Sequence, residues 1–141
     1  MTALTLIAGI PWGMLAHSGE LQSRVPADQL KEAQSLTNPF PVTKAFVEKG
    51  RILYEGRTFC WACHGRDGQG LQVGPDYDSS TQPLPTNFTN GAWQAARSDG
   101  EIFWILKHGS HGTDMAGFLP QYVSEEEGWQ LVSFLRSFKG A

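Results

Sequence analysis

Five consecutive residues, Cys60-Trp61-Ala62-Cys63-His64, form the pattern C-x-x-C-H. This pattern is typical of covalent haem attachment, because two thiols at this spacing can add to the two vinyl groups of one haem while the next imidazole binds the iron. Cys60 and Cys63 are the only two cysteines in the chain. If both carry haem, no thiol remains for a disulfide or a second metal. The single motif therefore predicts a single covalent haem c.

Three other interpretations of this pentapeptide are weaker. A redox-active C-x-x-C pair begins a helix after a strand in a βαβ pattern, and the sequence contains no such series of strands. A structural zinc site needs two further Cys or His ligands at motif spacing. The other histidines are His17, His108 and His111, and the last two do not form a second motif. A chance occurrence is the third interpretation, and the residues around the motif disfavour it.

A second axial ligand for the iron is predicted at Met115. The chain has three methionines, and Met1 and Met14 lie in the apolar amino-terminal stretch. A lone methionine is more often core filler than a ligand. Met115 differs because Gly112 and Gly117 flank it in a loop between two predicted helices, so the backbone can approach a haem face closely.

His108 and His111 are the rivals of Met115 for the sixth position. Either one would give a bis-histidine iron with a lower reduction potential. His108 falls at the end of a predicted helix and His111 in the loop that follows it. We expect both side chains to be exposed near the haem-side loop.

Composition excludes one class of partner. The net charge of the 141 residues is −3, and two haem propionates would add negative charge. A nucleic-acid partner would require a basic patch, so none is predicted. Sixteen glycines and eight prolines indicate a loop-rich fold whose loops wrap an apolar group.

Three helices are predicted from their ends. The first follows Thr43, a good N-cap, and runs from Lys44 to about Gly56. The second begins with the capping box from Ser98 to Glu101 and ends at Gly109, and the third begins with the capping box from Ser124 to Glu127. Gly50, in the middle of the first helix, costs about 0.5–1 kcal/mol relative to Ala, and a second helix crossing closely at that point would explain it. Long loops are expected from 65 to 89 and from 109 to 124.

The chain before the first long helix divides into two segments. Residues 1–18 are an apolar leader that resembles a secretory signal, although no basic residue precedes the apolar run. It is either cleaved after Ser18 or retained and packed on a partner subunit. Residues 19–40 are expected to form an extended tether, with a short helix between Asp28 and Ser35. The folded domain is expected over residues 41–141.

With these elements assembled, the chain resembles a class I monohaem c-type cytochrome of bacteria between about Asn38 and Lys139. The resemblance implies an all-α cytochrome c fold, in which three main helices and long loops surround one covalently bound haem. It implies that Cys60 and Cys63 form the thioethers and that His64 and Met115 are the axial ligands. It also implies that a proline-loop carbonyl accepts a hydrogen bond from His64, a role for which Pro75, Pro83 and Pro85 compete.

The function that follows is one-electron transfer rather than enzyme catalysis. With His and Met in both axial positions, the iron has no open site for a substrate. The expected partners are a redox donor and a redox acceptor of a respiratory type, with a membrane electron-transfer complex as one setting, in the periplasm or at the outer face of the cytoplasmic membrane. The alternative is a haem-based sensor or enzyme whose sixth site is open or labile.

Overall fold

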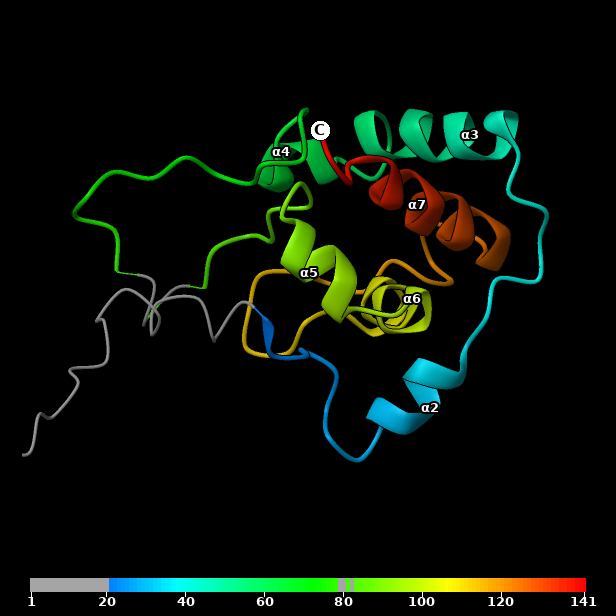
Figure 1. Ribbon diagram of the computed structural model, residues 1–141, viewed down its shortest axis with the longest axis horizontal. Coiled ribbons are helices and arrows are strands. Elements are labelled where there is room, and N and C mark those ends of the chain that lie inside the picture. Colours follow the sequence, from blue (N-terminus) through cyan, green and yellow to red (C-terminus); the bar gives the residue numbers. More distant parts are fainter. Residues whose placement is uncertain (1–20, 79–80, 82) are drawn as a thin grey trace, which may run out of the picture.

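The computed structural model describes residues 21–78, 81 and 83–141. The described residues form helices joined by loops and contain no strand, which confirms the predicted all-α class. The apolar leader at 1–18 lies outside the described residues. Figure 1 shows the order along the chain: α2 (Leu30–Ser35), α3 (Lys44–Glu55), α4 (Cys60–His64), α5 (Gly91–Ala96), α6 (Asp99–His108) and α7 (Glu125–Ser137). Among the described helices, none is long and apolar enough to cross a membrane.

Helices α3 and α7 cross in direct backbone contact at Gly50. A Cβ atom at this position would lie 2.0 Å from the carbonyl oxygen of Gln130, so no larger residue fits without moving one helix. The aromatic residues next to the crossing interlock, with the fully buried Tyr54 ring 5.2 Å from that of Phe134 at an angle of 65°. The predicted close crossing of the first helix is thereby confirmed.

The caps that predicted the three main helices are all present. The Thr43 hydroxyl accepts a hydrogen bond from the Phe46 amide at 3.1 Å, and both capping boxes close in both directions. Helix α6 then packs on α7 through Phe103 and Trp129, whose rings stack at 4.2 Å. The three main helices therefore share one apolar core.

The described part of the 19–40 segment is packed, so the prediction of an extended tether is wrong there. Helix α2 lies across α6, as Figure 1 shows at the bottom of the view, and a Cβ at Gly100 would lie 2.1 Å from the Ala33 carbonyl oxygen. Val25 and Ala33 are buried against Trp104. The physical reason is that α6 is apolar on two faces, and the face that α7 does not cover needs a second layer.

Two short helices frame the long loop. Helix α4 is the C-x-x-C-H motif itself, and α5 is capped by Asn90, whose side chain accepts from the amides of Ala92 and Trp93. Neither helix was predicted, because each has fewer residues than the periodicity of a helix needs to become visible. The loop between them carries no regular element in its described residues and extends away from the helices in Figure 1.

Candidate haem site

The C-x-x-C-H motif is a single helical turn with a sharp bend at each end. Phe59, just before it, has a φ of 50°, and Gly65, just after it, has a φ of 75°. Two hydrogen bonds tie this turn to the end of α3. The Tyr54 hydroxyl donates to the Gly65 carbonyl at 2.6 Å, and the Thr58 hydroxyl donates to the Leu53 carbonyl at 2.6 Å. The motif is thus fixed to the helix crossing at both of its ends.

The two cysteines differ in their surroundings. Cys60 is half-buried with its Sγ atom 3.2 Å from the Thr58 hydroxyl, whereas Cys63 is exposed. Burial raises the pKa of the Cys60 thiol. A catalytic dithiol requires a lowered thiol pKa, so the environment of Cys60 disfavours the thiol-exchange interpretation.

A zinc interpretation of the motif also finds no support in the geometry. Across residues 21–78, 81 and 83–141, no three His, Cys, Asp or Glu side chains gather where they could hold a metal ion. A structural zinc site needs four such ligands. The geometry therefore disfavours zinc as the group that the cysteine pair and His64 bind.

The His64 imidazole is oriented by one segment of the long loop. Its Nδ1 atom lies 3.0 Å from the carbonyl oxygen of Thr86, and its ring stacks on Phe88 at 4.5 Å and 23°. Burial lowers the pKa of His64, which keeps the ring neutral, and Nδ1 then donates its proton to Thr86. The Nε2 lone pair is left available, which is the arrangement that a metal-ligating histidine requires.

The acceptor of this hydrogen bond is none of the three proline candidates. Pro75, Pro83 and Pro85 were expected to compete for it, but the carbonyl belongs to Thr86, directly after Pro85. The last proline therefore sits next to the acceptor rather than supplying it. A second close approach supports this part of the loop, because a Cβ at Gly70 would lie 2.8 Å from the Pro85 carbonyl oxygen.

Met115 lies in a compact turn whose backbone bonds to itself. The Ser110 amide donates to the Met115 carbonyl at 2.9 Å, and the Met115 amide donates to the Thr113 hydroxyl at 3.2 Å. Gly109, with a φ of 79°, allows the chain to fold back so closely that a Cβ there would lie 2.7 Å from the Met115 carbonyl oxygen. The half-buried Met115 side chain packs against the main core.

The two rival histidines are exposed, as expected. His108 and His111 both lie against Trp104, with ring centroids 4.4 and 6.4 Å from the indole. That indole belongs to the separate small core beneath α2. The structure therefore places both histidines beside the α2 layer, whereas Met115 borders the main core.

The surroundings of the motif fit a large apolar group. Cys60, Trp61 and Met115 are half-buried at the edge of the same core. Three apolar side chains of the long loop are 39–47% exposed: Leu71, Val73 and Leu84. Within the described residues, the buried indole Nε1 atom of Trp61 has no hydrogen-bond partner, which is expected of a site that a further group completes. Haem has the mixed apolar and polar character that such a site requires.

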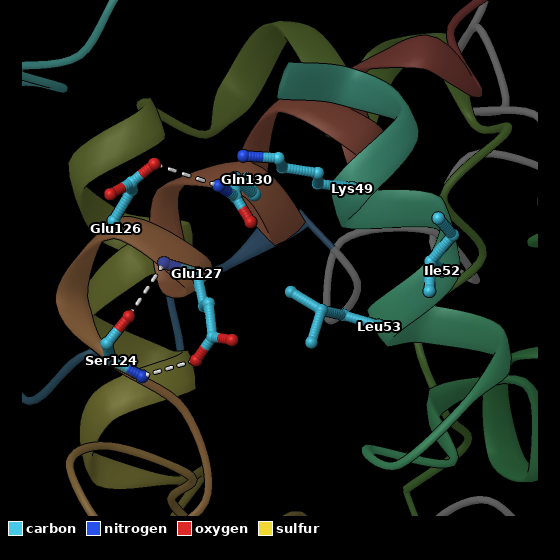
Figure 2. A pocket seen from close by; sticks show the side chains of 7 residues that line it. All are labelled: Lys49, Ile52, Leu53, Ser124, Glu126, Glu127 and Gln130. Atoms are coloured by element: carbon cyan, nitrogen blue, oxygen red, sulfur yellow. Dashed lines mark hydrogen bonds between the residues drawn. The ribbon is translucent and has the colours of Figure 1, made fainter. Parts of the chain in front are cut away.

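A groove of about 570 Å³ lies elsewhere, between α3 and α7 (Figure 2). It is lined by Lys49, Ile52, Leu53, Ser124, Glu126, Glu127 and Gln130. None of the residues expected to hold haem lines it. The groove is shallow and bordered by charged side chains, and it is distinct from the surroundings of the motif.

Comparisons with known proteins agree with this geometry. The family model described as cytochrome c matches residues 47–139. The KustC0563 c-type cytochrome is 30% identical with a TM-score of 0.50, over 64% of this chain and 96% of that chain. A chain of the Kuenenia stuttgartiensis reducing HAO-like protein complex Kustc0457/Kustc0458 is 25% identical with a TM-score of 0.58, over 75% of this chain.

The present chain spans about half of that longer chain, 48% of its length. No curated protein matches the sequence. The family match covers the crossing helices, the C-x-x-C-H turn and the Met115 loop, which are the parts that the geometry brings together. The chain belongs to the cytochrome c family.

Proposed function

We propose that this protein is a one-electron carrier with one haem c, attached through Cys60 and Cys63 and ligated axially by His64 and Met115. The observation that carries the proposal is the orientation of His64. His64 directly follows the cysteine pair in the same helical turn. Its Nδ1 atom lies 3.0 Å from the Thr86 carbonyl oxygen, and its ring stacks on Phe88. A hydrogen bond from Nδ1 to a carbonyl fixes a metal-ligating imidazole and makes it more basic.

The chain and the group that it would hold divide the chemistry. When bound, haem supplies an iron that alternates between the ferrous and ferric states. The two thiols fix the group covalently to a turn that is itself hydrogen-bonded to α3. The thioether of Met115, a neutral ligand, favours the ferrous state and raises the potential. The buried Phe88 stacks on the His64 ring and covers one face of it, and no side chain is required as a general acid or base.

The partners are proposed to be redox proteins, one donor and one acceptor. A structural relative is a chain of a reducing HAO-like complex, which supports a role as a module that passes electrons to or from a larger assembly. We place the protein in the periplasm or at the outer face of the cytoplasmic membrane, since a c-type haem is attached outside the cytoplasm in the family that the chain resembles. With a net charge of −3, steering toward a partner is weak or favours a basic surface.

The competing function is a haem sensor or enzyme with an open or labile sixth site. Absorption spectroscopy of the purified holoprotein separates the two. The carrier is expected to show the ferric band of sulfur ligation, and its ferrous spectrum is expected to stay unchanged when carbon monoxide is added. Mass spectrometry should find one haem on a peptide that contains Cys60 and Cys63. A ferrous spectrum that responds to carbon monoxide would contradict the carrier and support the sensor.

A further inference from the structure

Both contacts that orient the His64 ring come from one three-residue stretch of the long loop. Thr86 accepts its Nδ1 proton and Phe88 stacks on its face. The Phe88 amide donates to the Gly68 carbonyl at 2.7 Å, so the backbone N–H of Phe88 is anchored. The contact that the Phe88 carbonyl makes therefore determines how firmly this stretch, and with it the imidazole, is held.

The Phe88 carbonyl is bound by Gln94, a polar side chain that is only 4% exposed. Its Nε2 atom donates to the Phe88 carbonyl at 2.8 Å and to the Leu135 carbonyl at 2.9 Å. One amide group thus joins the loop that orients His64 to helix α7. A buried amide that makes both donor bonds to backbone carbonyls fixes their separation, because leaving either carbonyl unpaired would cost free energy.

Gln94 is in turn clamped by Arg136 of α7. The Nη1 atom of Arg136 donates to the backbone oxygen of Gln94 at 2.7 Å and to its Oε1 atom at 2.9 Å. The same guanidinium donates through Nη2 to the Arg97 carbonyl at 2.5 Å and through Nε to Asp99 at 2.6 Å. Both donor hydrogens of the Gln94 amide and one lone pair of its Oε1 atom are therefore engaged, and the rigid fork of the arginine fixes the orientation of the amide.

We propose that Gln94, clamped by Arg136, is a positioning residue that sets the strength of the hydrogen bond from His64 to Thr86, and through it the reduction potential of the haem. The inference rests on His64 being the proximal ligand, as proposed above. A firm Nδ1 bond makes the imidazole a stronger electron donor and stabilises the ferric state. If the loop is held less firmly, that hydrogen bond weakens and the reduction potential rises.

The test compares two buried glutamines in the holoprotein. Gln94→Met removes the amide and keeps the volume, and Gln130→Met is the matched control, because Gln130 is also 4% exposed but its amide donates to Glu126 at 3.1 Å instead. We expect Gln94→Met to raise the midpoint potential. We also expect the His64 Nδ1 proton, followed by NMR, to exchange about tenfold faster, the effect of losing about one buried hydrogen bond. Gln130→Met should leave both quantities at the wild-type values.

Arg136→Lys is the second variant, and it decides the matter if Gln94→Met yields no holoprotein. It keeps the positive charge but loses the fork, and it should change the potential and the proton exchange in the same direction by a smaller amount. Arg51→Lys, an exposed substitution on α3, is its control. Unchanged or lowered potentials in the variants at 94 and 136, with wild-type proton exchange, would overturn the inference alone. Wild-type holoprotein without hyperfine-shifted His64 resonances would overturn the proposed function instead.

Discussion

The two proposed axial ligands are held in opposite ways. His64 is oriented by side chains and carbonyls that lie far from it in the sequence, including Thr86 and Phe88. Met115 lies in a turn whose hydrogen bonds run among neighbours, from Ser110 to Met115. The proximal side is thus part of the tertiary structure, whereas the distal side is a local loop. Such a loop opens at a lower free energy than the packed core, so the distal ligand should be the first to be lost under stress.

The largest expected effect removes the support that both sides share. Gly50→Val adds side-chain atoms at a position where a Cβ alone would lie 2.0 Å from the Gln130 carbonyl oxygen. Separating α3 from α7 should cost about 3 kcal/mol or more of unfolding free energy, and both ligands should be lost together in chemical denaturation. The control is Gly74→Ala, where an added Cβ meets nothing within 4 Å. If Gly50→Val unfolds at the wild-type denaturant concentration, the crossing is not the shared support.

The second prediction separates the two sides. Met115→Ala should leave haem attached and His64 bound, while it lowers the reduction potential and opens the iron to small ligands, because the neutral sulfur ligand that favours the ferrous state is gone. Redox titration and carbon monoxide binding measure the two changes. The paired control is His108→Ala with His111→Ala, which should change neither. Normal ligation in Met115→Ala would pass the distal role to one of these histidines.

The third prediction tests whether the distal turn acts through contact or through backbone strain. Gly109 and Gly112 both have positive φ values, 79° and 77°, but only at Gly109 would a Cβ collide, 2.7 Å from the Met115 carbonyl oxygen. Replacing either by Ala incurs a conformational cost of about 1–2 kcal/mol. Only Gly109→Ala should also displace Met115 and lower the temperature at which the sulfur-ligation band disappears. Equal losses of that band in the two variants would show that strain alone is responsible.

The smallest effect is expected outside both ligand regions, at Glu101. Burial by itself raises the pKa of this carboxyl, but hydrogen bonds from the Ser98 amide, the Ser23 hydroxyl and the Ser98 side chain outweigh it and lower the pKa. A lowered folded-state pKa gives stability that is present at neutral pH and is lost as the pH falls through the acid range.

Glu101→Gln should therefore flatten the acid side of the stability profile by less than about 1 kcal/mol, with haem ligation unchanged. Urea unfolding between neutral and acidic pH measures it. The control is Glu125→Gln in the exposed first turn of α7. An acid profile identical to that of the wild type would show that the charge of the Glu101 carboxylate contributes nothing to stability.

The sequence predicted what local chemistry determines. Ser98 and Ser124 predict the starts of their helices because a capping box is complete within four residues. Gly50 indicated a crossing because a glycine in the middle of a helix is unfavourable unless close packing requires it. The packing of α2 on α6 was missed, although the unbroken apolar run from Ile102 to Leu106 was visible. Such a run leaves no polar face and so calls for a cover on two sides.

The parts of the site that could not be predicted depend on contacts between distant residues. The acceptor for His64 is Thr86, 22 residues away in sequence, and no spacing rule selects one carbonyl of a long loop. The clamp of Gln94 by Arg136 spans 42 residues, and a glutamine in a short helix gives no signal of burial. The only hint was the loop length itself, which is uncommon unless the loop wraps a ligand.

The crossing of α3 and α7 also has a consequence for chain entropy. Arg57 and Glu127 form an ion pair across it although 70 residues separate them in the sequence. Closing a loop of that length costs about 4 kcal/mol of chain entropy before any other contact is made. The C-x-x-C-H turn, the Thr86 segment and the Met115 turn all lie inside this one closure. Once the two helices meet, every remaining contact of the site closes a shorter loop at a smaller entropic cost.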